Sequence, residues 1–468
     1  MRRMTSYALG VLSAGLLGLA CNSSSSTSPD GGTTPDSSSA DRGVSADAAP
    51  SSCAAGTAAP VEHTGYLKSS ETWGSDTPHL VKGDLTVPKD MTLTISPCAD
   101  VRLKKSARFI VLGTLVARGE AAKRIRFRRD NPSERYSSLW IRDPGKADLA
   151  YADLEGGGDL PGQTYGATIQ VEGGAWPPSK PLRVEHVTVS HSAGYGIWMT
   201  KWAGFADGST DLTVTASGET ATEYPFALRM TLNTVGTLPD GKYTGNATDE
   251  IQVIGESPYY ESRLDDTFHN RGVPYQIGGN GAFGLINVVG AGALSTLTIE
   301  AGVTIKFFGS PSNIGGLFIG NTGVAGTGKI VAVGTASAPI TFTAPGKSPA
   351  PGAWEGVSFL GTVVPGNRLE YVKIEAAGAH GGDSGFGCPP TGSTFATDGA
   401  LKIFAQPSEA FLKNSTISNS SSHGVFRAWN GLEVDFLPTN TFQNIAGCTQ
   451  ILPKDDKRLC PKDPPCPK

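Results

Sequence analysis

The residues of this chain best suited to chemistry are a run of cations between positions 101 and 135, where eleven Lys and Arg stand against three acidic residues. The candidate ligand-binding members are those that alternate with apolar residues: Arg102, Lys104, Arg124, Arg126 and Arg128. Because alternation with a period of two puts neighbouring side chains on opposite sides of a strand, we expect these cations to face outward. Such a row could attract an extended anionic ligand: an acidic polysaccharide, lipopolysaccharide phosphates or extracellular DNA. Alternatively, it is a solvated surface that prevents aggregation.

Aromatic residues provide a second kind of candidate site, since indole and phenyl rings can stack on sugars. Four of them cluster in the middle of the chain: Trp176, Trp198, Trp202 and Phe205. Trp198 matches Phe426 in the repeat described below, so packing within the fold explains it better. Trp176, in the run GGAWPP at 173–178, has no counterpart and is the better ligand candidate.

A catalytic alternative depends on a set of carboxylates near the basic run: Asp143, Asp148, Asp153, Glu155 and Asp159. A glycoside hydrolase needs paired carboxylates, and a polysaccharide lyase of this kind needs calcium-binding Asp residues with an Arg or Lys base. The sequence has no zinc-ligand spacing, nucleophile elbow or phosphate-binding loop, so it indicates no metal or cofactor. His186 and His191 match Asn414 and Asn419, which predicts turn positions with unusual backbone angles and no role as ligands.

The elements that must position these residues belong to a long internal repeat. Residues 71–95 match residues 266–299, and the correspondence continues in order through 186–198 and 414–426 as far as 238–243 and 437–442. Short alternating runs are separated by Gly, Asn, Asp and Pro every eight to fifteen residues. Two-residue hairpin turns of the Asn-Gly type do not connect them, so a parallel β-helix fits better than an antiparallel sandwich. We therefore predict an all-β solenoid built from two tandem homologous units, residues 53–260 and 261–450.

Several motifs resemble those of exported, often lipid-anchored bacterial proteins with right-handed parallel β-helix repeats. They are the runs LTI at 93–95 and 297–299, GTLVARG at 113–119, PITFT at 339–343 and LEYVKIE at 369–375. The first copy departs from the pattern at Cys98, where the second has Gly302, and at Arg124, where the second has Pro339. The resemblance covers about residues 65–450. It implies a right-handed parallel β-helix and no particular activity, because such proteins share a scaffold and not a chemistry.

The N-terminus predicts export. Arg2 and Arg3 precede an uncharged apolar run that ends in Ala20, which is typical of a signal peptide at 1–20. Cys21 follows and is the candidate lipidation site; ordinary cleavage after Ala20 without a lipid is the alternative. Residues 22–52 contain no aromatic residue and predict, with Cys21, a disordered tether at 21–52. We expect a protein attached to the outer membrane by its lipid, at the periplasmic face or the cell surface.

The remaining cysteines fit an oxidising compartment. They are Cys53, Cys98, Cys388, Cys448, Cys460 and Cys466. Six cysteines allow up to three disulfides in fifteen possible pairings, and the sequence does not choose among them. Most of them lie near the ends of the array, where exposed strand edges need cover, including the polar C-terminal tail at 451–468.

These observations together predict a lipid-anchored, non-catalytic envelope protein that binds a polysaccharide or another extended anionic ligand. The alternatives are a polysaccharide lyase or glycoside hydrolase, and a purely structural envelope protein. A net charge of −4 indicates no specific nucleic-acid partner. We expect a monomer.

Overall fold

The computed structural model describes residues 53, 58–159, 166–220, 225–256, 261–279, 281–282, 284–309, 315–321, 328–380, 398–429, 431–451 and 466. The predicted signal peptide, Cys21, the tether, Cys388, Cys460 and almost all of the tail lie outside the described residues. Within them the chain is β throughout, apart from one short 3-10 helix, η1 (Val235–Thr237). No helix in this part of the chain is long and apolar enough to cross a membrane.

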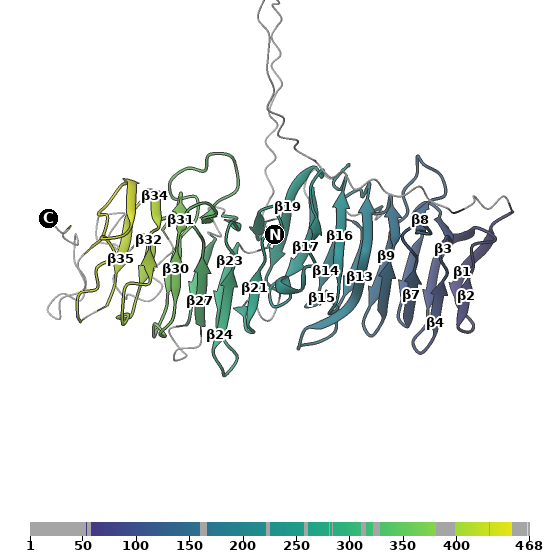
Figure 1. Ribbon diagram of the computed structural model, residues 1–468, viewed down its shortest axis with the longest axis horizontal. Helices are drawn as coiled ribbons and strands as arrows, with labels where there is room; N and C mark the ends of the chain where they lie inside the picture. Colours follow the sequence, from purple (N-terminus) through teal and green to yellow (C-terminus); the bar gives the residue numbers. More distant parts are fainter. Residues whose placement is uncertain are drawn as a thin grey trace, which may run out of the picture. The chain divides into compact units, whose positions relative to one another are not determined.

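The strands pair in parallel, each with a strand about three elements further along the chain. Three strands therefore complete one turn, and successive turns stack as a parallel β-helix (Figure 1). The predicted all-β parallel β-helix is confirmed. Its turns follow one another side by side from β1 (Val61–Tyr66) to β35 (His423–Arg427).

Three ladders of strands form the first half of the stack, and β3 and β13 each belong to two of them. The first ladder consists of β2 (Glu71–Trp73), β4 (Thr92–Ile95), β7 (Thr114–Arg118), β10 (Lys146–Ala150), β13 (Ser179–Ser190) and β15 (Ala203–Phe205). The second consists of β3 (His79–Val87), β5 (Asp100–Leu103), β8 (Ile125–Arg129), β11 (Ala152–Glu155), β13, β16 (Thr210–Thr215) and β18 (Gly241–Lys242). The third consists of β3, β6 (Arg108–Val111), β9 (Ser138–Arg142), β12 (Ala167–Glu172), β14 (Tyr195–Thr200), β17 (Phe226–Thr231) and β19 (Thr248–Ile254).

The second half also has three ladders. One continues the third ladder through β22 (Tyr275–Ile277), β25 (Thr304–Phe307), β28 (Ile340–Thr343), β31 (Val372–Glu375), β34 (Thr416–Ser420) and β36 (Thr441–Ile445). Another consists of β20 (Glu261–Ser262), β23 (Leu285–Val288), β26 (Gly316–Ile319), β29 (Val357–Phe359), β32 (Gly399–Ile403) and β35. The last consists of β21 (Asp266–Phe268), β24 (Ser295–Ile299), β27 (Gly328–Val333), β30 (Arg368–Glu370) and β33 (Leu412–Lys413).

The two sequence copies meet out of phase by one ladder. By sequence, β22 and β25 of the second copy correspond to the first half of β3 and to β5, which lie in the second ladder. In the structure β22 pairs with β19 and so continues the third ladder. The hydrogen-bonded sheet thus continues from β19 of the first copy to β22 of the second, while β22 and β25 lie on a different ladder from their sequence equivalents.

The core is built from the apolar half of each alternating strand. Leu93 and Leu115 are in register on neighbouring turns, and both are fully buried. Ile125 and Phe127, two positions apart on β8, are buried as well. Identical inward positions stack turn upon turn at about 4.8 Å, the separation of hydrogen-bonded strands. The core is therefore one continuous column that passes through both sequence copies.

The turns between strands force several residues into the left-handed region. His186 and His191 have φ of 52° and 55°, and the matching Asn414 and Asn419 have φ of 50° and 53°. The prediction that these histidines occupy turn positions with unusual backbone angles is confirmed. Asn and His tolerate this region better than most residues other than Gly.

Two disulfides lie within the described residues. Cys53 is bonded to Cys98, which lies between β4 and β5 near the start of the stack, and Cys448 is bonded to Cys466, after β36. Cys98 has φ of 67°, and Gly302 at the equivalent turn of the second copy has φ of 82°. The turn thus favours glycine, and the first copy has a cysteine there that holds the preceding segment in place.

Candidate functional site

The predicted cationic row faces outward from β5 and β8, where its members alternate with buried Val101, Leu103, Ile125 and Phe127. Most of its charge is, however, neutralised by acidic residues on the same and neighbouring turns. Arg102 and Arg128 both bind Asp100, at 2.9 and 2.7 Å. Arg124 binds Asp153 of β11 at 2.7 Å and also donates to the carbonyl oxygen of His186.

The electrostatics of Asp100 show how firmly this row is paired. Burial acts to raise the pKa of the Asp100 carboxyl, but hydrogen bonds from Arg128 and Arg102 outweigh it, so the pKa is lowered. Among the described residues, only Arg126 and Lys104 of the five candidate cations have no carboxylate partner. The row is therefore mainly a set of ion pairs between stacked turns, and it offers little free charge to a ligand.

Most of the candidate catalytic carboxylates are engaged by cations, including Asp153 and Glu155, which share the outward face of β11. Asp148 pairs with Arg118 and Arg183, Asp153 with Arg124 and Glu155 with Arg129. Asp159 accepts a hydrogen bond from Ser106, and Asp143 lies in a separate pocket. No group of three or more His, Cys, Asp or Glu suited to a metal is found in the described part of the chain.

A row of outward residues on the third ladder presents the best-formed candidate site. Strand pairing places Trp140 of β9, Gln170 of β12, Trp198 of β14 and Arg229 of β17 in register on four successive turns. All four side chains are partly exposed. The two indoles are two turns apart, about 9.6 Å at the usual strand spacing. We call these four residues the aromatic row.

An arginine guanidinium lies over each indole ring of the aromatic row. The Arg142 Cζ lies 4.4 Å from the centre of the Trp140 ring, and the Arg229 Cζ lies 5.4 Å from the centre of the Trp198 ring. Such cation–π contacts hold both partners in place. The combination of a ring face and a fixed cation is one that can hold a ring bearing a polar or charged substituent.

The second sequence copy serves as a control for this row. Its equivalent residues on β29, β32 and β35 are Ser358, Lys402 and Phe426, which are in register in the same way. All three are buried, with exposed fractions of 0, 3 and 1%. A partly exposed aromatic row is therefore not a requirement of the repeat, which makes it a functional candidate.

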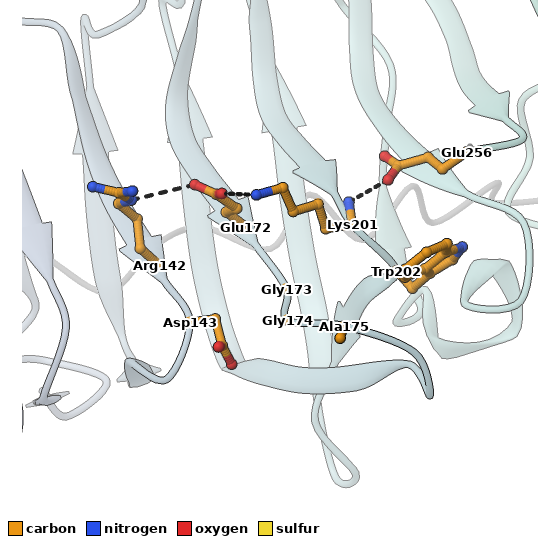
Figure 2. Close-up of a pocket in the computed structure, with 9 residues that line it drawn as sticks. All are labelled: Arg142, Asp143, Glu172, Gly173, Gly174, Ala175, Lys201, Trp202 and Glu256. Carbon is orange, nitrogen blue, oxygen red and sulfur yellow. Dashed lines mark hydrogen bonds and ion pairs between the residues drawn. The ribbon is translucent and has the colours of Figure 1, made fainter. Parts of the chain in front are cut away.

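Beside the aromatic row, at the ends of the same strands, lies a pocket of about 500 Å³ (Figure 2). Figure 2 shows an ion-paired chain that crosses three turns, in which Glu172 binds both Arg142 and Lys201. Glu256 accepts a hydrogen bond from the Lys201 backbone N–H at 2.6 Å. Burial raises the pKa of Glu256, although this hydrogen bond and nearby cations oppose the shift.

The floor of the pocket is the loop that follows β12. Gly173 must be glycine because a Cβ there would lie 2.2 Å from the carbonyl oxygen of Lys201 on the next turn. A second hollow, of about 310 Å³, shares Asp143 and Glu172 with the pocket and extends toward Lys180. The two hollows thus adjoin at the ends of β9 and β12.

Trp176, the predicted aromatic ligand candidate, lies on this same loop. Its ring meets that of Trp202 edge to face, with ring centres 5.7 Å apart. Trp202 lines the pocket and is 7% exposed, whereas Phe205 is fully buried in the core. The structure therefore places Trp176 beside the pocket, and Trp198 in the aromatic row.

Sequence reasoning missed Trp140 and Arg229. The signal for Trp140 was present, because the run SLWIR at 138–142 alternates strictly and puts the indole opposite buried Leu139 and Ile141. That Trp140 stands in line with Trp198, 58 positions later, depends on the lengths of two intervening turns. Compared with protein-family models, curated proteins and solved structures, the chain matches none of them.

Proposed function

We propose that the protein binds an extended polysaccharide along the aromatic row without cleaving it, and that it does so in the cell envelope, held to the outer membrane by a lipid on Cys21. The observation that carries the proposal is the alignment of Trp140 and Trp198 two turns apart on one outward face. Two aromatic surfaces at a fixed repeat suit a ligand that is itself repetitive.

The physical argument is one of matching periods. Turns of the stack are about 4.8 Å apart, which is close to the length of one pyranose residue in an extended chain. Indole faces bury the apolar C–H faces of sugars, while neighbouring polar groups bond the hydroxyls. Gln170 stands between the two indoles, and the hollow lined by Glu172 and Lys201 runs beside them.

The binding site proposed here differs from the cationic row. Arg102, Arg124 and Arg128 already have carboxylate partners, so a ligand would have to compete with those pairs. At the aromatic row a ligand would contact the parts of the indoles that Arg142 and Arg229 leave exposed, without breaking a carboxylate pair. A polysaccharide lyase or glycoside hydrolase is less well supported, because Glu172 in the pocket is engaged by two cations, and Asp148, Asp153 and Glu155 are each paired with arginine.

The test is binding of the full-length protein, purified in detergent, to a panel of neutral and acidic polysaccharides by affinity electrophoresis. Each indole is only partly exposed, so sugar can cover about a quarter of the roughly 200 Å² of its side chain, which at about 25 cal/mol per Å² contributes about 1.3 kcal/mol. Trp140→Ala and Trp198→Ala should each weaken binding by about tenfold. Tyr66→Ala is the matched control, because it removes an exposed aromatic ring on β1, the first strand, away from the aromatic row.

The same reactions distinguish the alternatives. Release of short oligosaccharides would show an enzyme and contradict the proposal. Retention of no polysaccharide by the wild-type protein would favour a purely structural role. For the anchor, Cys21→Ser should move the protein from the detergent phase to the aqueous phase in a phase-separation assay, and an unchanged partition would contradict lipidation.

A further inference from the structure

Arg229 differs from the other cations of its neighbourhood. Its guanidinium stacks on Trp198, and its backbone is in register with Trp198 on one side and Gln252 on the other. No described residue forms an ion pair with it. Arg142, which stacks on Trp140 in the same way, is paired with Glu172 at 3.3 Å.

The surroundings of Arg229 leave this charge incompletely compensated. The side chain is partly buried, and its Nε is buried with no hydrogen-bond acceptor in the described part of the structure. Glu256 is near enough for Arg229 to lower its pKa, but burial has the larger, opposite effect on that carboxyl. A partly desolvated cation that forms no ion pair with a described carboxylate is costly, and an anion bound to its Nη atoms would relieve that cost.

The geometry of a guanidinium restricts what that anion can be. Its planar fork of N–H donors matches two oxygens of one carboxylate or sulfate. Because one face of the same group lies over the Trp198 ring, an anion bound to Arg229 lies beside a ring stacked on that indole. An acidic sugar carries both parts in one residue.

We propose that Arg229 binds the anionic group of an acidic sugar whose ring stacks on Trp198, so that the ligand of the aromatic row is an acidic polysaccharide. This inference rests on the proposed function of the row. Arg229 would then determine specificity, while Trp140 and Trp198 would supply affinity for any extended sugar chain.

The experiment compares the full-length protein and its variants on three polymers. Polygalacturonate carries carboxylates, its fully methyl-esterified form has the same backbone without the charge, and dextran sulfate carries sulfates. The variants are Arg229→Gln, Arg229→Lys and Trp198→Ala. The control is Lys373→Gln, which removes one positive charge from an exposed position on β31.

The wild-type protein should bind one of the two charged polymers more tightly than the methyl ester. The preferred polymer identifies the anionic group of the ligand as a carboxylate or a sulfate. Arg229→Gln should bind that polymer about ten- to a hundredfold more weakly, the loss expected for one charged hydrogen-bonded pair, while binding the methyl ester as the wild type does. Arg229→Lys keeps the positive charge but lacks the planar fork of N–H donors, so its affinity for the charged polymer should lie between those of the wild type and Arg229→Gln. Lys373→Gln should match the wild type.

Equal binding of the charged polymer by Arg229→Gln and the wild type, with loss in Trp198→Ala, would overturn this inference and leave the aromatic row as a polysaccharide site. An equal loss in Lys373→Gln and Arg229→Gln would show a general effect of charge and also overturn it. Binding unaffected by Trp198→Ala, and by Trp140→Ala measured on the same polymers, would refute the proposed function itself. Far-ultraviolet circular dichroism checks that each variant is folded. If Arg229→Gln does not fold, the comparison of Arg229→Lys with the wild type still tests the inference.

Discussion

The disulfide between Cys53 and Cys98 allows two stabilising effects to be separated at one position. The bond joins residues 45 positions apart in the sequence, and closing a loop of that length in the unfolded chain is worth about 4 kcal/mol. Cys98 also has φ of 67°, in the region where a Cβ is unfavourable. Its replacement by glycine removes the bond and the strain together, whereas replacement by alanine removes only the bond.

The magnitudes follow from these two contributions. Cys53→Ala and Cys98→Ala should each lower the free energy of opening of the first turns by about 4 kcal/mol. Cys98→Gly should lower it by only about 3 kcal/mol, because relief of left-handed strain exceeds the extra backbone entropy of glycine by about 1 kcal/mol. Gly302→Ala, at the equivalent turn of the second copy, breaks no disulfide and should lower the free energy of opening of that turn by about 1 kcal/mol.

Hydrogen exchange of the amides in β4 and β5 is the assay, because it reports local opening and not only global unfolding. A loss of 4 kcal/mol corresponds to about a thousandfold faster exchange at these amides. Exchange in Cys98→Gly as fast as in Cys98→Ala would refute the argument from backbone strain. Unchanged exchange in Cys53→Ala would refute the role of the bond.

Three further predictions concern the turns and the core. Burial, and then the charge of His79, lower the pKa of His63 to about 4, below the usual value near 6.5. Between these two pH values the unfolded chain binds a proton that the folded chain does not, so the folded state should have its full stability above pH 6.5 and lose stability as the pH falls toward 4. The midpoint of denaturant unfolding should follow this trend, and His63→Gln should make its pH dependence smaller. Phe127→Ala should cost about 3–5 kcal/mol in calorimetric unfolding, because it empties a fully buried ring site, whereas the outward Arg126→Ala should cost less than about 1 kcal/mol. Asn414→Ala should cost about 1 kcal/mol and Asn414→Gly less, since φ there is 50°; equal losses in thermal unfolding would contradict this.

The strand interiors could be predicted from the sequence because their information is local. Alternation alone places Ile125 and Phe127 inside and Arg126 outside, whatever the strand pairs with. The same holds for the turn at His186, where the matching Asn414 already indicates a left-handed residue. The stacking of turns into a parallel β-helix follows once the repeat and the absence of hairpin turns are recognised.

The contacts between turns could not be predicted in this way. Arg124 meets Asp153, 29 positions later, because Asp153 is in register with Arg126, two residues beyond Arg124, and this register depends on turn lengths that vary along the chain. One residue more or less would exchange inward and outward side chains at the contact. For the same reason the pairing of Cys53 with Cys98, and the alignment of Trp140 with Trp198, required the structure.

The junction of the two copies, where β22 continues the third ladder, has a consequence for how such chains lengthen in evolution. A duplicated segment was accommodated although it arrived one strand out of step with the segment before it. Every ladder presents the same backbone donors and acceptors at the same spacing, so any strand end can accept any ladder of an added copy. Growth by duplication is then not limited to whole numbers of turns. Equivalent strands such as β5 and β25 also come to lie on different ladders, where each is free to diverge toward its own role.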